Sequence, residues 1–240
     1  MADYRTMGTV GVGSRSANID AGLKAHMSKI YGLMSIAMLI TGGVAFAVGT
    51  NEALLAAIFG TPLRWVVMFA PLVVVFAMGA MINRLSAGAA QLVFWGFSAL
   101  MGLSISYIFA VYTGISIAQT FMVTAIAFAG LSLYGYTTKK DISAWGSFLI
   151  MGVIGLILAS IVNIFLASPA LQFAISSLGV LIFAGLTAYD TQRLKNEYLQ
   201  MANHGESEWL AKSAIMGALS LYLNFVNMFM FLLQFMGGRE

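Results

Sequence analysis

The sequence contains no cysteine and very little charge. Asp, Glu, Lys and Arg make up only 9% of the 240 residues, whereas an ordinary soluble domain has about 25%. The absence of cysteine excludes disulfides, thiol catalysis and zinc or iron–sulfur sites that use cysteine ligands. The net charge of +3 is small and scattered along the chain, so we expect no nucleic-acid partner.

Long apolar runs dominate what is present, since 60% of the residues are hydrophobic. Seven stretches contain no Asp, Glu, Lys or Arg and are close to the roughly 20 residues that cross the hydrocarbon of a bilayer. Lipid offers no hydrogen-bond partner to a free backbone, so each stretch must be helical. We therefore predict an all-α polytopic membrane protein with seven transmembrane helices. The stretches cover approximately residues 30–48, 65–82, 89–112, 115–136, 145–166, 170–189 and 213–236.

The distribution of Lys and Arg predicts how the chain is inserted. Ten of the twelve fall on one side of the membrane, and only Arg64 and Arg239 fall on the other. Cytoplasmic loops carry the Lys and Arg excess, so we expect a cytoplasmic N-terminus and an external C-terminus. We predict a flexible cytoplasmic arm over residues 1–22, one seven-helix domain over 23–240, tight hairpins at 112–115 and 167–170, and a long cytoplasmic loop over 191–212.

The seventh stretch carries a polar stripe. Its members follow one another at intervals of four, three, four and three residues, which places them on one face of a helix. Such a face should meet protein or water, and two interpretations stay open. The stripe is either a packing seam of small and amide side chains or the wall of an ion or proton path beside Asn224. Either interpretation makes this helix central. The stripe consists of Ser213, Gly217, Ser220, Asn224 and Asn227.

Asp190 follows the sixth stretch directly, at the expected C-terminal end of that helix. The negative end of the helix dipole repels a carboxylate there, so another group must favour it. One interpretation is an interfacial ion pair with Arg193, one turn later. The other is a carboxylate at the cytoplasmic mouth of a cavity, with Arg84 as the approaching cation. Arg84 is otherwise explained as an ordinary anchor at the membrane interface.

No catalytic constellation is found in the seven stretches. A retinal protein needs a Lys within a span, and none is there. His26 and His204 lie outside the stretches, which argues against a buried His ligand or an intramembrane Ser–His protease. Aspartyl proteolysis would need a second carboxylate beside Asp190. We therefore expect no enzyme and no cofactor.

Three segments resemble the Bax inhibitor-1 (transmembrane Bax-inhibitor-motif) family, in particular its bacterial branch. They are SLYGYTTKKD at 132–141, GLTAYDTQ at 185–192 and LSLYLNFVN at 219–227. The resemblance runs from about residue 23 onward. It implies seven helices with the last one central, a bacterial inner-membrane location and a pH-sensitive calcium leak. In some bacterial relatives it implies interaction with a membrane-anchored AAA protease.

The resemblance also implies a pH sensor made of two aspartates and an Arg latch. The first aspartate corresponds to Asp190 and the latch to Arg84, but the second position holds Asn224, where the family usually has Asp. Two close carboxylates share a proton, whereas one carboxylate beside an amide has a single titrating group. Calcium prefers several oxygen ligands that include carboxylates. We therefore expect at most a weak calcium site at Asp190.

Three functions are compatible with these patterns. The leading one is a passive leak for calcium or for a proton-linked cation. Its gate would be a movement of the seventh helix against the second and sixth. The residues expected along the path are Asp190, Asn224, Arg84, Asn227 and Ser220. The alternative is a regulatory membrane protein that binds a protease or other membrane partner through its arm and its long loop. A small-molecule transporter is the third, and the scarcity of buried charge disfavours it.

Overall fold

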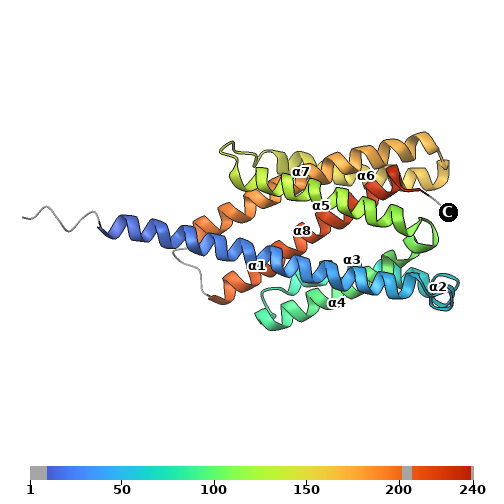
Figure 1. Ribbon diagram of the computed structural model, residues 1–240, viewed down its shortest axis with the longest axis horizontal. Coiled ribbons are helices and arrows are strands. Elements are labelled where there is room, and N and C mark those ends of the chain that lie inside the picture. Colours follow the sequence, from blue (N-terminus) through green and yellow to red (C-terminus); the bar gives the residue numbers. More distant parts are fainter. Residues whose placement is uncertain (1–9, 202–206, 239–240) are drawn as a thin grey trace, which may run out of the picture.

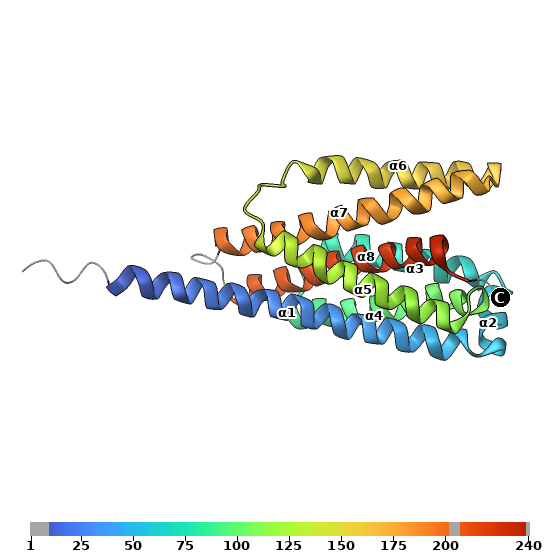
Figure 2. The same ribbon diagram turned by 45° about the horizontal axis from the view of Figure 1, so that its top comes forward.

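The computed structural model describes residues 10–201 and 207–238, which form a bundle of long helices without strands in these ranges (Figures 1 and 2). Seven helices are long and apolar enough to cross a membrane, as predicted. They are α1 (Val10–Gly49), α3 (Leu63–Met81), α4 (Ala87–Ile105), α5 (Gly114–Thr137), α6 (Trp145–Leu166), α7 (Pro169–Met201) and α8 (Ser207–Met236). The protein is therefore a polytopic all-α membrane protein.

Two short helices complete the fold. A helix that the sequence reading did not predict, α2 (Glu52–Phe59), joins α1 to α3 and begins where Asn51 accepts a hydrogen bond from the backbone N–H of Leu54. A 3₁₀ helix, η1 (Ser106–Ala110), extends α4. Its tighter turn ends the span before the hairpin to α5.

Both predicted hairpins are present, and each has a local cause. Thr113 accepts a hydrogen bond from Ser116 N at 3.2 Å, which caps the N-terminus of α5. Ala167 ends α6 in the left-handed conformation, with φ of 46°. Pro169 then begins α7, where a proline is tolerated because the first helical N–H has no partner to lose.

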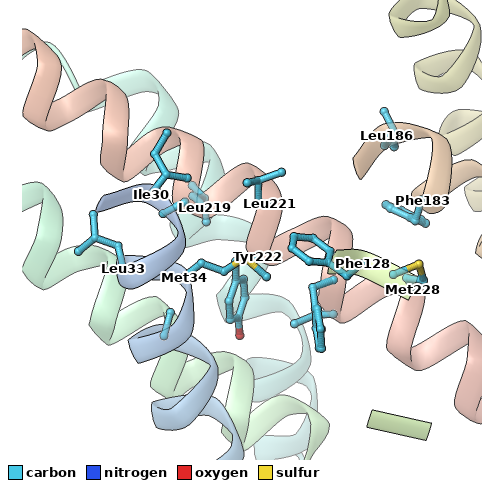
Figure 3. Close-up of a cluster of buried hydrophobic side chains, with 14 of the residues drawn as sticks. Ile30, Leu33, Met34, Phe128, Phe183, Leu186, Leu219, Leu221, Tyr222 and Met228 are labelled. Atoms are coloured by element: carbon cyan, nitrogen blue, oxygen red, sulfur yellow. The ribbon is translucent and has the colours of Figure 1, made fainter. Parts of the chain in front are cut away.

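The last helix is the centre of the bundle, as expected. It packs against α1, α4, α5 and α7, and 61% of its most apolar window is buried, against 11% for α3 and for α6. Figure 3 shows side chains of α1, α5 and α7 gathered around Tyr222 and its neighbours on α8. Tyr222 is completely buried, and its hydroxyl lies 2.6 Å from Thr41 Oγ1.

The sixth predicted span does not end before Asp190, and this expectation was wrong. Helix α7 continues to Met201, so much of the loop predicted over 191–212 is helical, and α8 already includes Ser207. The reason is packing: Leu194 and Tyr198 are buried, and the Tyr198 ring lies 5.1 Å from the ring of His26 on α1. Asp190 is therefore inside a helix, where the argument from the helix terminus does not apply.

Helix α1 also begins earlier than the first predicted span. It is helical from Val10, so it includes residues 10–22 of the expected arm, and residues 1–9 lie outside the described residues. Figure 1 shows this end of α1 projecting beyond the neighbouring helices.

Candidate functional site

Asp190 is a buried carboxylate between α7 and α8. The residue is only 5% exposed. From α8, Asn224 Nδ2 donates to Asp190 Oδ2 at 2.7 Å and Ser220 Oγ donates to the same oxygen at 2.9 Å. Both donors belong to the polar stripe, so two of its members hold the carboxylate across the helix interface.

The charge of Asp190 is balanced by Arg193 of the same helix. Arg193 Nη2 lies 2.9 Å from Asp190 Oδ1 and 3.4 Å from Ser220 Oγ. Its Nε lies 3.6 Å from Glu197 Oε1, one turn further along α7. Arg193 is therefore shared between a buried and a more exposed carboxylate. Charge-assisted bonds of this kind are stronger than neutral ones.

Arg84, expected as the latch, is placed elsewhere. It is exposed in the turn after α3, and the cation that contacts Asp190 among the described residues is Arg193. The alternative explanation of Asp190, an ion pair one helical turn away, is thus the one that the geometry shows. In the structure the Asp190 carboxylate of this pair is buried, because α8 covers the carboxylate.

The other members of the stripe have separate roles. Asn227 Nδ2 donates to Leu223 O of its own helix at 2.8 Å, so it does not contact Asp190. Gly217 lies where a Cβ would press against Leu194 of α7 and Ile30 of α1. The stripe therefore combines a packing seam with a polar site, and neither interpretation of it excludes the other.

A cavity of about 550 Å³ lies next to the ion pair. Arg193 and Ser220 line it, and they separate it from the Asp190 carboxylate. It is open because α3 packs against α4 and, within the described residues, not closely against α8. Its remaining lining comes from α3 (Val75, Gly79) and the turn after it (Ile82, Asn83), from α7 (Leu194, Glu197) and from α8 (Trp209, Lys212, Ser213, Met216, Gly217, Leu219, Leu223).

Between Asn224 and the far end of the bundle, the α7–α8 interface contains an aromatic layer. The rings of Phe183 and Phe231 stack with centroids 5.9 Å apart. The Phe231 ring also occupies the space that a Cβ on Gly179 would need.

A second polar cluster, which the sequence reading missed, lies at that far end. Gln172 Nε2 donates to Gln234 Oε1 at 2.8 Å, and Ser176 Oγ donates to the same oxygen at 3.2 Å. Asn163 of α6 donates to Gln172 at 3.1 Å. These residues line a cavity of about 400 Å³. Gln234 lies seven residues after Asn227, or two helical turns, so it continues one polar face of the helix, and this spacing was the signal available in the sequence.

The described residues contain no group of three His, Asp or Glu side chains that could hold a metal ion. Around Asp190 the neighbouring side-chain oxygens belong to Ser220 and Asn224 and are neutral. A divalent cation at this position would thus meet one carboxylate.

Comparison with known proteins gives a consistent result. A family model described as inhibitor of apoptosis-promoting Bax1 matches residues 23–240. An uncharacterized protein of Caulobacter vibrioides is 49% identical over 93% of this chain and 92% of its own length. The inner membrane protein YbhL of Escherichia coli K12 is 46% identical over 92% of this chain and 94% of its own. A Rickettsia prowazekii protein is 40% identical over the full length of both chains.

Proposed function

Because the chain belongs to the Bax inhibitor-1 family, we propose that it is a passive, pH-sensitive cation leak, for calcium among other ions. We place it in a bacterial inner membrane, because the Escherichia coli relative is named an inner membrane protein. In this proposal Asp190 is the cation-attracting group and the chain is not an enzyme.

The observation that carries the proposal is a buried carboxylate beside an open cavity. Buried charge inside a membrane is costly and marks ion pathways. Asp190 is such a charge, and its partners Arg193 and Ser220 face the cavity. The guanidinium occupies the position that an entering cation would take. A cation can reach Asp190 only when Arg193 moves away.

The path is closed in this conformation at two levels. The ion pair between Arg193 and Asp190 closes the inner level, and the Phe183–Phe231 stack closes the outer level. The Phe183–Phe231 stack joins α7 to α8, and Ser220 and Asn224 of α8 hold the Asp190 carboxylate. A movement of α8 against α7 and α3 would therefore separate the rings and release the carboxylate from its α8 partners. The amide cluster around Gln234 would then be the outer end of the path.

In this proposal the pH response comes from the ion pair of Asp190 with Arg193, which depends on the charge of the carboxylate. A neutral carboxylic acid no longer attracts Arg193, and the guanidinium can then turn toward Glu197. The groups that face Asp190 from α8 are Ser220 and Asn224, which do not titrate. The expected response is therefore that of one proton. With one carboxylate, calcium would bind weakly.

Calcium entry into proteoliposomes that hold the purified protein, measured from pH 6 to 8, tests the proposal. We expect flux above that of protein-free liposomes, and we expect Asp190→Asn to remove its pH dependence. The matched control is Asp141→Asn, which removes an exposed carboxylate in the α5–α6 loop. No flux from the wild-type protein at any pH would overturn the leak.

A regulatory role is the second candidate, and the length of the helices favours it. At 1.5 Å per residue, the 40 residues of α1 and the 33 residues of α7 are about 60 and 50 Å long, against roughly 30 Å of hydrocarbon. Their ends therefore project from the membrane on the side expected to be cytoplasmic. In this second proposal the projecting helix ends are the surface to which a membrane-anchored AAA protease binds. Crosslinking in native membranes tests this, and capture of no such partner would contradict it.

A further inference from the structure

A groove of about 530 Å³ runs between α1 and α5, away from the cavity at Asp190. The two helices line it together but, within the described residues, do not pack closely against each other. The lining positions recur every three or four residues on each helix, so one face of each helix forms a wall. They are Lys24, Met27, Ser28 and Tyr31 on α1, and Phe128, Ala129, Ser132, Leu133 and Tyr136 on α5.

The groove is apolar along most of its length and cationic at one end. Lys24 is exposed at the end that Tyr136 also lines, and it forms no ion pair with any described residue. Lys195 of α7 adds a second positive charge there. Its Nζ donates to Tyr136 O at 2.8 Å and lies 5.2 Å from the centre of the Tyr136 ring. No acidic residue lines the groove.

The depth of the groove fits the leaflet of a bilayer. Lys24 and Tyr31 are seven residues apart, or about 10 Å along the helix axis. A leaflet has about 15 Å of hydrocarbon, half of the roughly 30 Å core. The apolar walls thus lie at acyl-chain depth and the lysines at headgroup level. The same α1–α5 seam continues into a second apolar groove of about 530 Å³ lined by Met38, Phe46 and Phe121, among others.

We propose that the α1–α5 groove is a binding site for an anionic phospholipid. One acyl chain lies between Met27 and Leu133, and the phosphate lies at Lys24. Lipid is the medium that surrounds this face of a membrane protein, and the two unopposed lysines select a negative headgroup over a zwitterionic one. A Lys near the headgroups contributes about 1 kcal/mol toward anionic lipid, or roughly fivefold in binding.

Native mass spectrometry of the full-length protein tests the proposal. The protein is equilibrated with phosphatidylglycerol and phosphatidylcholine of identical acyl chains, at equal mole fractions. We expect retained phosphatidylglycerol to exceed retained phosphatidylcholine by at least fivefold. Lys24→Gln should lower this ratio by roughly fivefold, and the contribution of Lys195 should remain. The control is Lys139→Gln, which removes an exposed lysine that does not line the groove and should leave the ratio unchanged.

A second pair of variants tests the groove itself. Ala129→Phe fills it from an exposed position and should lower the retention of both lipids. Ile126→Phe adds bulk at a position on α5 that is 67% exposed and does not line the groove, and it should retain both lipids. Unchanged retention in Ala129→Phe would overturn the site. Equal retention of the two lipids by the wild-type protein would overturn the preference for negative charge.

Discussion

Asn224 donates a 2.7 Å hydrogen bond from its Nδ2 to Oδ2 of Asp190, across the interface between α8 and α7. The amide therefore satisfies a carboxylate oxygen at the position where the resemblance to the family implies a second carboxylate. The amide donates a hydrogen bond to Asp190 and, unlike a carboxyl group, does not ionise. This contact explains how a single buried aspartate is accommodated in the centre of the bundle.

Replacing Asn224 by Asp should raise calcium flux severalfold and add a second titration step to its pH profile. Two carboxylate oxygens at about the present 2.7 Å cannot both be charged without a shared proton or a bound cation. The measurement is calcium entry into proteoliposomes from pH 6 to 8. Asn227→Asp is the control, because Asn227 bonds to its own helix. Equal flux in Asn224→Asp and the wild type would contradict the role of the pair.

Two substitutions distinguish the candidate latches. Arg193→Gln should raise resting flux, since it removes the charge that lies 2.9 Å from Asp190 Oδ1. Arg84→Gln should leave the flux of the closed conformation unchanged, because Arg84 is exposed after α3. The same proteoliposome assay at pH 7 decides between them. The reverse ranking would restore Arg84 as the latch and place Arg193 in a structural role.

Phe231→Ala should open the outer closure and increase flux. The change removes the ring that stacks on Phe183 and fills the space beside Gly179. Phe148→Ala is the control, because Phe148 is 75% exposed on α6. Flux that stays at the wild-type level in Phe231→Ala would show that the closure lies elsewhere.

Gly135→Ala should destabilise the protein, whereas Gly130→Ala on the same helix should not. A Cβ on Gly135 would collide with the backbone carbonyl oxygen of Ala188 on α7, and a Cβ on Gly130 would meet nothing. Overpacking of this kind costs about 1–3 kcal/mol, while alanine in an open helical position gains up to about 1 kcal/mol over glycine. Thermal unfolding of the two variants in detergent measures the difference. Equal melting temperatures would mean that α5 and α7 separate easily.

Asp141 should contribute nothing to a pH response near neutrality. The Ser143 hydroxyl and backbone N–H donate to Asp141, and these hydrogen bonds lower the pKa of its carboxyl below the ordinary value of 3.8. A lowered pKa gives stability that is present above the unfolded value and is lost as pH falls through the folded value. Asp141→Asn should therefore leave the pH dependence of the calcium flux and of the melting temperature unchanged between pH 6 and 8. A changed profile would show that Asp141 is coupled to the path.

The sequence by itself determined the seven spans, the polar stripe of the last helix and the choice of Asp190 as the carboxylate to consider. Each transmembrane helix satisfies its own backbone, so apolar length alone locates it, and a 3.6-residue period places Ser220 and Asn224 on one face. Asp190 directly follows an apolar stretch, and this position identified it as a candidate site residue.

Only the tertiary structure decided which cation reaches Asp190, where α7 ends and which grooves stay open. The apolar run stops before Asp190, but the helix continues because Leu194 and Tyr198 find partners on α8 and α1. Likewise, Arg193 rather than Arg84 meets the carboxylate because α3 packs on α4 and leaves a cavity beside α8. These outcomes depend on distances between helices, which a local sequence pattern does not contain.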